Sequence, residues 1–93
     1  MGLIMVLKLL SKKHVENILK LLNESGELYV QQINDEVKIN KSNLSQLLQE
    51  LQDNDFVSKR IDEDTAKNLP KSYFKLTEKG KRALKIYEMA EEL

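Results

Sequence analysis

The segment INDEVKINKSNLSQLLQELQDNDFVSKR, residues 33–60, decides the fold of this chain. Its apolar residues recur at the spacing of one helical face, which predicts two short helices over residues 30–37 and 41–53. The three residues KIN separate these helices, and Asn40 is a good N-cap for the second helix. The inward face of that helix is expected to consist of Leu44, Leu47, Leu48 and Leu51.

A hairpin and a final helix are predicted downstream. Residues 53–55, DND, should end the second helix, since Asn and Asp tolerate left-handed backbone conformation. Residues 56–77 hold two runs that alternate as strands do, with Phe74 and Leu76 on one face. The polar segment DEDTAKNLPK between the runs contains the only proline and is expected to be a loop. Thr77 is the expected N-cap of a helix over residues 78–92.

The segment before residue 30 predicts one more helix and a short extended piece. Ser11 is a plausible N-cap for a helix that ends near Asn23. Gly26 suits a left-handed cap after that helix, and the residues ELY that follow form either a short strand or an extended link. The apolar stripe of this helix consists of Val15, Ile18, Leu19 and Leu22.

Composition limits the classes of function. The chain of 93 residues makes one domain, carries fifteen basic and fifteen acidic residues, and has no cysteine. His14 stands alone, so no metal site or other cofactor is expected, and the scattered acidic residues do not suggest an enzyme. The apolar run MGLIMVLKLL, residues 1–10, is too short to span a bilayer and lacks the basic start of a signal peptide. A cytoplasmic protein without a membrane partner is expected.

Apolar residues in excess of one core predict a homodimer. The last helix carries two apolar seams, the first formed by Ala83, Leu84, Tyr87 and Ala90 and the second by Ile86, Met89 and Leu93. One seam should cover the core, and the other is surplus for a monomer. The predicted interface joins the surplus seam to the N-terminal run, through Leu3, Ile4, Val6, Leu7, Leu10, Ile86, Met89 and Leu93. The alternative is a single wide apolar face that packs on one core.

Residues 33–60, followed by YFKLTEKGKRAL at residues 73–84, resemble the winged helix-turn-helix regulators of bacteria and archaea. The multiple-antibiotic-resistance and arsenical-resistance repressors are familiar branches of that superfamily. The resemblance implies a mainly α fold with a small β-hairpin wing. Two positions depart from the family pattern: the wing loop begins with the acidic residues DED, and Asp55 stands where a glycine is usual.

The resemblance also implies the DNA-binding residues. The second helix of the motif would enter the major groove with its N-terminal half, and the wing would reach the neighbouring minor groove or backbone. By position, the contacts would come from Lys41, Ser42, Asn43, Ser45, Gln46 and Gln49 on the helix, and from Arg60, Lys67 and Lys71 in the wing. The absence of acidic residues from 41 to 49 favours this assignment, because Gln, Asn, Ser and Lys are side chains that bind bases and phosphates.

The sequence therefore predicts a sequence-specific protein that binds double-stranded DNA and regulates transcription as a homodimer. The alternative is a winged-helix module that binds other proteins, which the zero net charge and the acidic wing favour. A third reading is a repressor that senses a ligand between the N-terminal run and the last helix. The sequence identifies no small-molecule effector.

Overall fold

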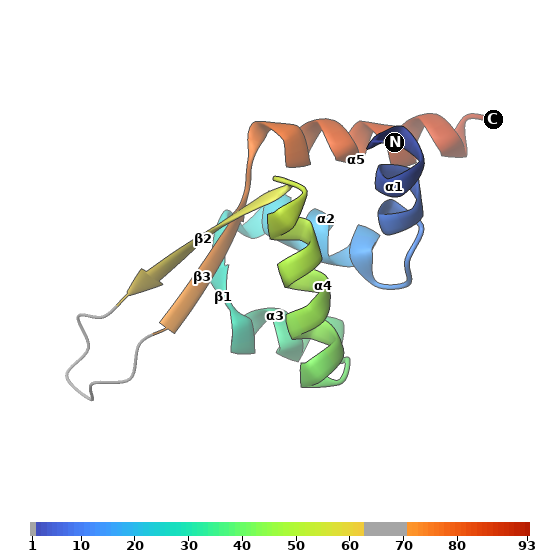
Figure 1. Ribbon diagram of the computed structural model, residues 1–93. Helices are drawn as coiled ribbons and strands as arrows, with labels where there is room; N and C mark the ends of the chain where they lie inside the picture. The colour runs from blue at the N-terminus through green and yellow to red at the C-terminus, as the bar shows by residue number, and fades with distance from the viewer. Residues whose placement is uncertain (1, 63–70) are drawn as a thin grey trace.

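The computed structural model describes residues 2–62 and 71–93, which form a mainly helical protein with a small antiparallel sheet (Figure 1). The fold class is the predicted one. The elements in chain order are α1 (Gly2–Leu10), α2 (Val15–Ser25), β1 (Glu27–Tyr29), α3 (Val30–Val37), α4 (Lys41–Asp53), β2 (Val57–Asp62), β3 (Lys71–Leu76) and α5 (Glu78–Glu91). No helix in the described part of the chain is long and apolar enough to cross a membrane.

The capping residues set where the later helices begin. Asn40 Oδ1 accepts hydrogen bonds from the backbone N–H groups of Ser42, at 2.7 Å, and Asn43, at 3.3 Å. Thr77 Oγ1 accepts a hydrogen bond from the N–H of Gly80 at 3.0 Å. Both N-caps are as predicted, because a side-chain oxygen at this position satisfies amides that have no partner within the helix.

Backbone with positive φ follows α4 and α2, where the sequence predicts left-handed conformation. Asp55 follows α4 with φ of 69°, as predicted for the DND segment. Gly26 has φ of 88° and donates its N–H to Leu22 O, but its ψ of −97° lies outside the left-handed helical region. Glycine is suited to this backbone because it has no Cβ to clash.

The beginning of the chain differs from the prediction. Residues 2–10 already form α1, and α2 begins at Val15 rather than just after Ser11. The Ser11 hydroxyl donates to Lys8 O at 2.8 Å, so it bonds the end of α1 and caps nothing downstream. His14 precedes α2 with φ of 77° and makes no capping hydrogen bond with its side chain.

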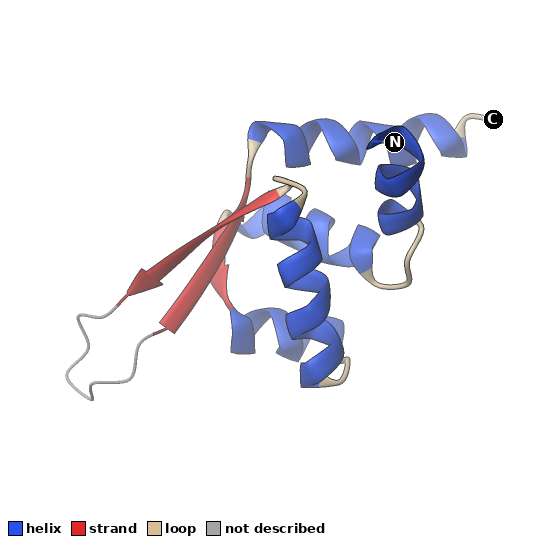
Figure 2. Cartoon of the chain, in the orientation of Figure 1, coloured by secondary structure: helices blue, strands red, loops and turns tan. Residues whose placement is uncertain are grey.

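The sheet has three strands in the order β1-β3-β2, since the residues ELY form a short strand, one of their two predicted alternatives, and add to the predicted hairpin. β1 pairs with β3 through Leu28 and Phe74, and β2 pairs with β3 through Val57 and Leu76. The predicted pair Phe74 and Leu76 is buried on one face. Figure 2 shows the strands on one side of the molecule, where β2 and β3 project away from the helices.

The core lies between the inner face of the sheet and helices α2, α4 and α5. The leucine stripe of α4 is buried, together with Val15, Ile18, Leu19 and Leu22 of α2 and Ala83 of α5. Leu10 also belongs to this core and is only 4% exposed, so its assignment to a dimer interface was wrong. The apolar run gave no direction for each side chain, whereas the observed α1 turns Leu9 and Leu10 inward.

Candidate nucleic-acid interface

Hydrogen bonds within the turn between α3 and α4 fix the position of α4 relative to α3. Lys38 ends α3 in left-handed conformation with φ of 58°, and its N–H donates to Asn34 O. The Asn34 side chain then reaches across the turn, where Nδ2 donates to Ile39 O at 2.6 Å. The start of α4 is therefore fixed by hydrogen bonds on both sides of Asn40.

The outward face of α4 carries the side chains predicted to bind DNA. The four leucines face the core, and six residues before and between them are exposed: Lys41, Ser42, Asn43, Ser45, Gln46 and Gln49. Gln49 is engaged within the helix, since Nε2 donates to Asp53 Oδ1 at 2.9 Å. The N-terminal half of α4 thus presents amides, hydroxyls and one ammonium group to solvent.

The register of the sheet separates the two basic residues of β2. Lys59 pairs with Phe74 and lines a groove of about 200 Å³ with Ser45 and Gln49 of α4. Arg60 pairs with Tyr73 and points to the other face, because neighbouring residues of a strand alternate. The resemblance predicts Arg60 as the contact residue of this strand, whereas the structure brings Lys59 to the α4 side.

Arg60 is held by partners on the outer face of the sheet. Its guanidinium forms two hydrogen bonds to the Glu27 carboxylate, at 2.8 and 3.2 Å, and lies 4.6 Å from the centre of the Tyr73 ring. The hydrogen bond from Arg60 lowers the pKa of Glu27, and the same bond raises the pKa of Arg60. This bidentate pair clips β1 to β2 across the central strand.

Lys71 lies near the start of α4. Its ammonium group is 4.6 Å from the centre of the Tyr29 ring, and Tyr29 packs edge-on against Tyr73. Lys71 and Lys41 line the same surface groove of about 350 Å³, together with Ser45 and Ser72. Two of the predicted cations therefore meet beside the N-terminus of α4. Lys67 lies outside the described residues, as does the side chain of Leu3.

The remaining apolar surface is concentrated on α1 and α5. Ile4 is 75% exposed and Met89 is 65% exposed, and Leu7, Ile86 and Leu93 are exposed as well. Val6 is half-buried against the core. Tyr87 joins the two helices, since its hydroxyl donates to Leu10 O at 2.8 Å. The second seam of α5 is thus left uncovered within one chain.

Comparison with known proteins identifies the class to which this fold belongs. The family described as winged helix DNA-binding domain matches residues 17–91. This chain belongs to that family.

Two relatives come from the archaeon Methanocaldococcus jannaschii. The uncharacterized protein MJ0944 is 48% identical over 85 residues, which cover 91% of this chain and 70% of that protein. The uncharacterized HTH-type transcriptional regulator MJ0361 is 39% identical over 87 residues, which cover 94% of this chain and 79% of that protein. The relatives therefore include a transcriptional regulator.

Solved structures of regulators share the fold. The reduced form of the transcriptional regulator YodB from Bacillus subtilis superposes with a TM-score of 0.80 at 23% identity, covering 94% of this chain and 82% of that chain. Bacillus subtilis PadR in complex with operator DNA gives a TM-score of 0.69 at 28% identity, covering 77% of this chain and 44% of that chain.

Proposed function

We propose that this protein is a sequence-specific regulator of transcription that binds double-stranded DNA as a homodimer. The observation that carries the proposal is the outward face of α4, which is exposed, rigidly capped and free of acidic residues from 41 to 49. Glutamine and asparagine bind adenine edges with two hydrogen bonds, and lysine binds phosphates. The resemblance to the multiple-antibiotic-resistance and arsenical-resistance repressors supports the same function.

The homodimer is supported by the uncovered apolar side chains of α1 and α5. The exposed side chains are Ile4 and Leu7 of α1, Ile86 and Met89 of α5, and Leu93 just after the end of α5. Large exposed apolar patches are unusual on monomers and mark interaction surfaces. A two-fold axis through this surface would present two α4 helices to half-sites spaced by about one helical turn, roughly 34 Å.

The test compares a base-reading residue with a phosphate anchor. Gln46→Ala should lower the preference for the cognate duplex by roughly 1–3 kcal/mol, because it removes a two-hydrogen-bond base contact. Lys41→Ala should weaken binding to all duplexes equally and reduce the salt slope by about one unit. Fluorescence anisotropy with selected and scrambled duplexes over a salt series measures both effects.

Circular dichroism melting is needed to establish that both variants are folded, since a general loss of folding would also weaken binding to every duplex. The proposal is falsified if the wild-type protein binds no duplex even at low salt, where counterion release most favours association.

A protein-interaction module is the second candidate. It is favoured by the zero net charge of the chain and by the Glu27–Arg60 pair, which occupies one of the cations assigned to the wing. Such a module would show neither the base-specific loss of Gln46→Ala nor the salt effect of Lys41→Ala.

A further inference from the structure

The turn between α1 and α2 places three basic side chains beside α4. Lys12, Lys13 and His14 line one side of a surface groove of about 340 Å³, and Asn43, Gln46 and Glu50 of α4 line the other. The groove facing the wing is lined instead by Ser45, Gln49 and Gln52 of α4. The turn and the wing therefore lie on opposite sides of α4, as Figure 1 shows.

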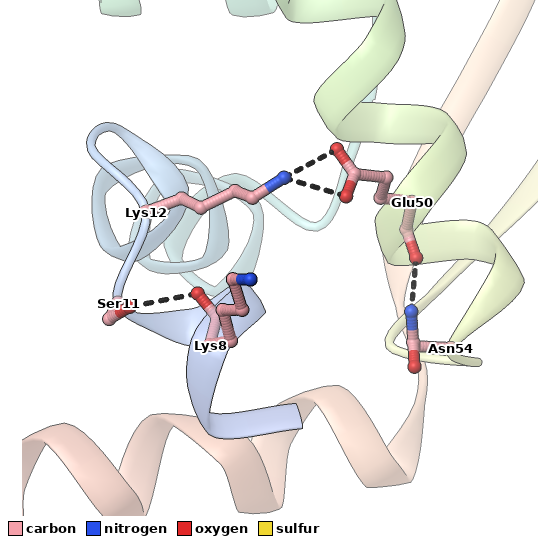
Figure 3. A network of polar contacts seen from close by, with 5 residues as sticks. All are labelled: Lys8, Ser11, Lys12, Glu50 and Asn54. Atoms are coloured by element: carbon pink, nitrogen blue, oxygen red, sulfur yellow. Dashed lines mark hydrogen bonds and ion pairs between the residues drawn. The ribbon is translucent and has the colours of Figure 1, made fainter. Parts of the chain in front are cut away.

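An ion pair fixes this turn to α4. Lys12 Nζ lies 2.8 and 3.0 Å from the two carboxylate oxygens of Glu50 (Figure 3). Side-chain hydrogen bonds also stabilise the C-terminal ends of α1 and α4. Ser11 Oγ donates to Lys8 O and Asn54 Nδ2 donates to Glu50 O, each at 2.8 Å. The pair also neutralises Glu50, which is the first acidic residue along α4.

Lys13 is left free by this arrangement. Its side chain is exposed, and among the described residues it has no ionic or hydrogen-bonding partner. With Glu50 already paired to Lys12, the charge that the turn adds beside Asn43 and Gln46 is positive. A positive surface next to a helix that lies in the major groove fits the phosphate backbone.

We propose that the turn at residues 12–14 forms a second phosphate-binding surface, on the side of α4 opposite the wing. This inference rests on the proposed function and adds a contact outside the helix-turn-helix and the wing. The major groove is about 12 Å wide and has a phosphate strand on each side. Basic groups on both flanks of a helix in the groove can therefore bind phosphates, and the turn supplies the second flank.

The location of the turn also predicts which phosphates it binds. The turn directly follows α1, which carries part of the proposed dimer surface. With α1 at the two-fold axis, the turn would lie between α4 and that axis, and Lys13 would bind phosphates between the two half-sites. The wing binds phosphates farther from the centre.

The salt dependence of duplex binding tests the proposal. Lys13→Ala should weaken binding to cognate and scrambled duplexes alike and reduce the salt slope by about one unit, and Lys13→Arg should restore both. The matched control is Lys20→Ala, because Lys20 pairs with Glu16 at 2.7 Å and lines a different groove with Glu24 and Glu36. The control should leave the slope unchanged.

A second variant tests the ion pair from the opposite direction. Glu50→Gln removes the acid that holds Lys12, so it should tighten binding and steepen the salt slope. Replacing the central phosphates of the duplex by methylphosphonates should weaken duplex binding by the wild-type protein more than it weakens binding by the Lys13→Ala variant. Circular dichroism melting establishes that each variant is folded.

The outcomes separate this inference from the proposed function. If Lys41→Ala lowers the salt slope while Lys13→Ala and Glu50→Gln leave it unchanged, the turn does not touch DNA and the proposed function stands. If the wild-type protein binds no duplex at low salt, both fail.

Discussion

Thr77 and Gly80 join the last helix to the turn after α4. The Thr77 hydroxyl donates to Asp55 O at 2.6 Å and accepts from the N–H of Gly80, while the N–H of Thr77 donates to Phe56 O at 3.1 Å. A Cβ atom on Gly80 would lie 2.1 Å from Phe56 O. The residues LTEKG therefore have a physical role. Thr77 forms hydrogen bonds within α5 and with the turn after α4, and Gly80 allows these two segments to approach closely.

Gly80→Ala should destabilise the protein by about 3 kcal/mol, at the upper end of overpacking costs, because the added methyl group meets a backbone oxygen. Urea denaturation measures the change, with Lys81→Ala as an exposed control in the same helical turn. Helix propensity alone predicts a gain of about 1 kcal/mol for Gly80→Ala. A variant as stable as wild type would contradict the close approach.

Tyr87 should make stability depend on alkaline pH. Burial, followed by the charge of Glu16, raises the pKa of Tyr87 to about 12, above its ordinary value of 10.0. A raised pKa in the folded state favours the neutral phenol, so its contribution to stability is complete below pH 10 and is lost as pH approaches 12. The phenolate also cannot donate to Leu10 O.

Tyr87→Phe should cost about 1 kcal/mol near neutral pH, through the lost hydrogen bond, and should reduce the loss of stability between pH 10 and 12. Thermal melting over this pH range compares the variant with wild type. An identical pH profile for the two proteins would show that another group is responsible.

At the scale of the elements, helices with strong caps were predictable and non-local pairing was not. The leucine spacing and Asn40 predicted α4 from residue 41 to 53, as observed. The predicted N-cap role of Ser11 is wrong, because the preference of serine for N-caps does not reveal that Ser11 follows the end of another helix. The pairing of β1 with β3 was missed since three residues carry no periodicity, and their partner lies far along the chain.

In the candidate site, too, local features were predictable from the sequence and non-local packing was not. The apolar stripe of α4 determined which of its residues face outward, and the structure leaves all six exposed. Alternation in β2 showed that Lys59 and Arg60 lie on opposite faces, but it could not show which face meets α4. That choice depends on the packing of α4 against the sheet.

The two neighbouring cations of β2 should therefore respond differently to removal. Lys59→Ala should reduce the salt slope of DNA binding by about one unit, because Lys59 faces the groove beside Gln49. Arg60→Ala should leave the slope unchanged and lower the denaturation midpoint, because it breaks the pair with Glu27. A slope reduced by Arg60→Ala alone would reverse this assignment.

For the whole molecule, the uncovered seam of α5 is the feature that most affects assembly. Ile86 and Met89 of α5 and Leu93 just after its end are exposed, whereas Ala83 of the first seam is buried in the core. Burial of such side chains in a partner contributes about 25 cal/mol for each Å² removed from water. In a monomer these side chains stay in contact with water, so this stabilising free energy is not gained.

Ile86→Asp should convert the proposed dimer into a monomer, since an unpaired charge is costly to bury in an apolar interface. Sedimentation equilibrium measures the mass of the protein in solution, with the exposed neighbour Lys85→Ala as the control. Wild-type protein that sediments as a monomer at tens of micromolar would refute the dimer.

The central position of β3 has a consequence for the order of folding events. β1 and β2 enclose the helix-turn-helix in the sequence, and both pair only with β3, which follows them all. The pairing of Leu28 with Phe74 therefore has to close a long loop, and such non-local contacts form slowly. The sheet against which α4 packs is expected to be completed late in folding.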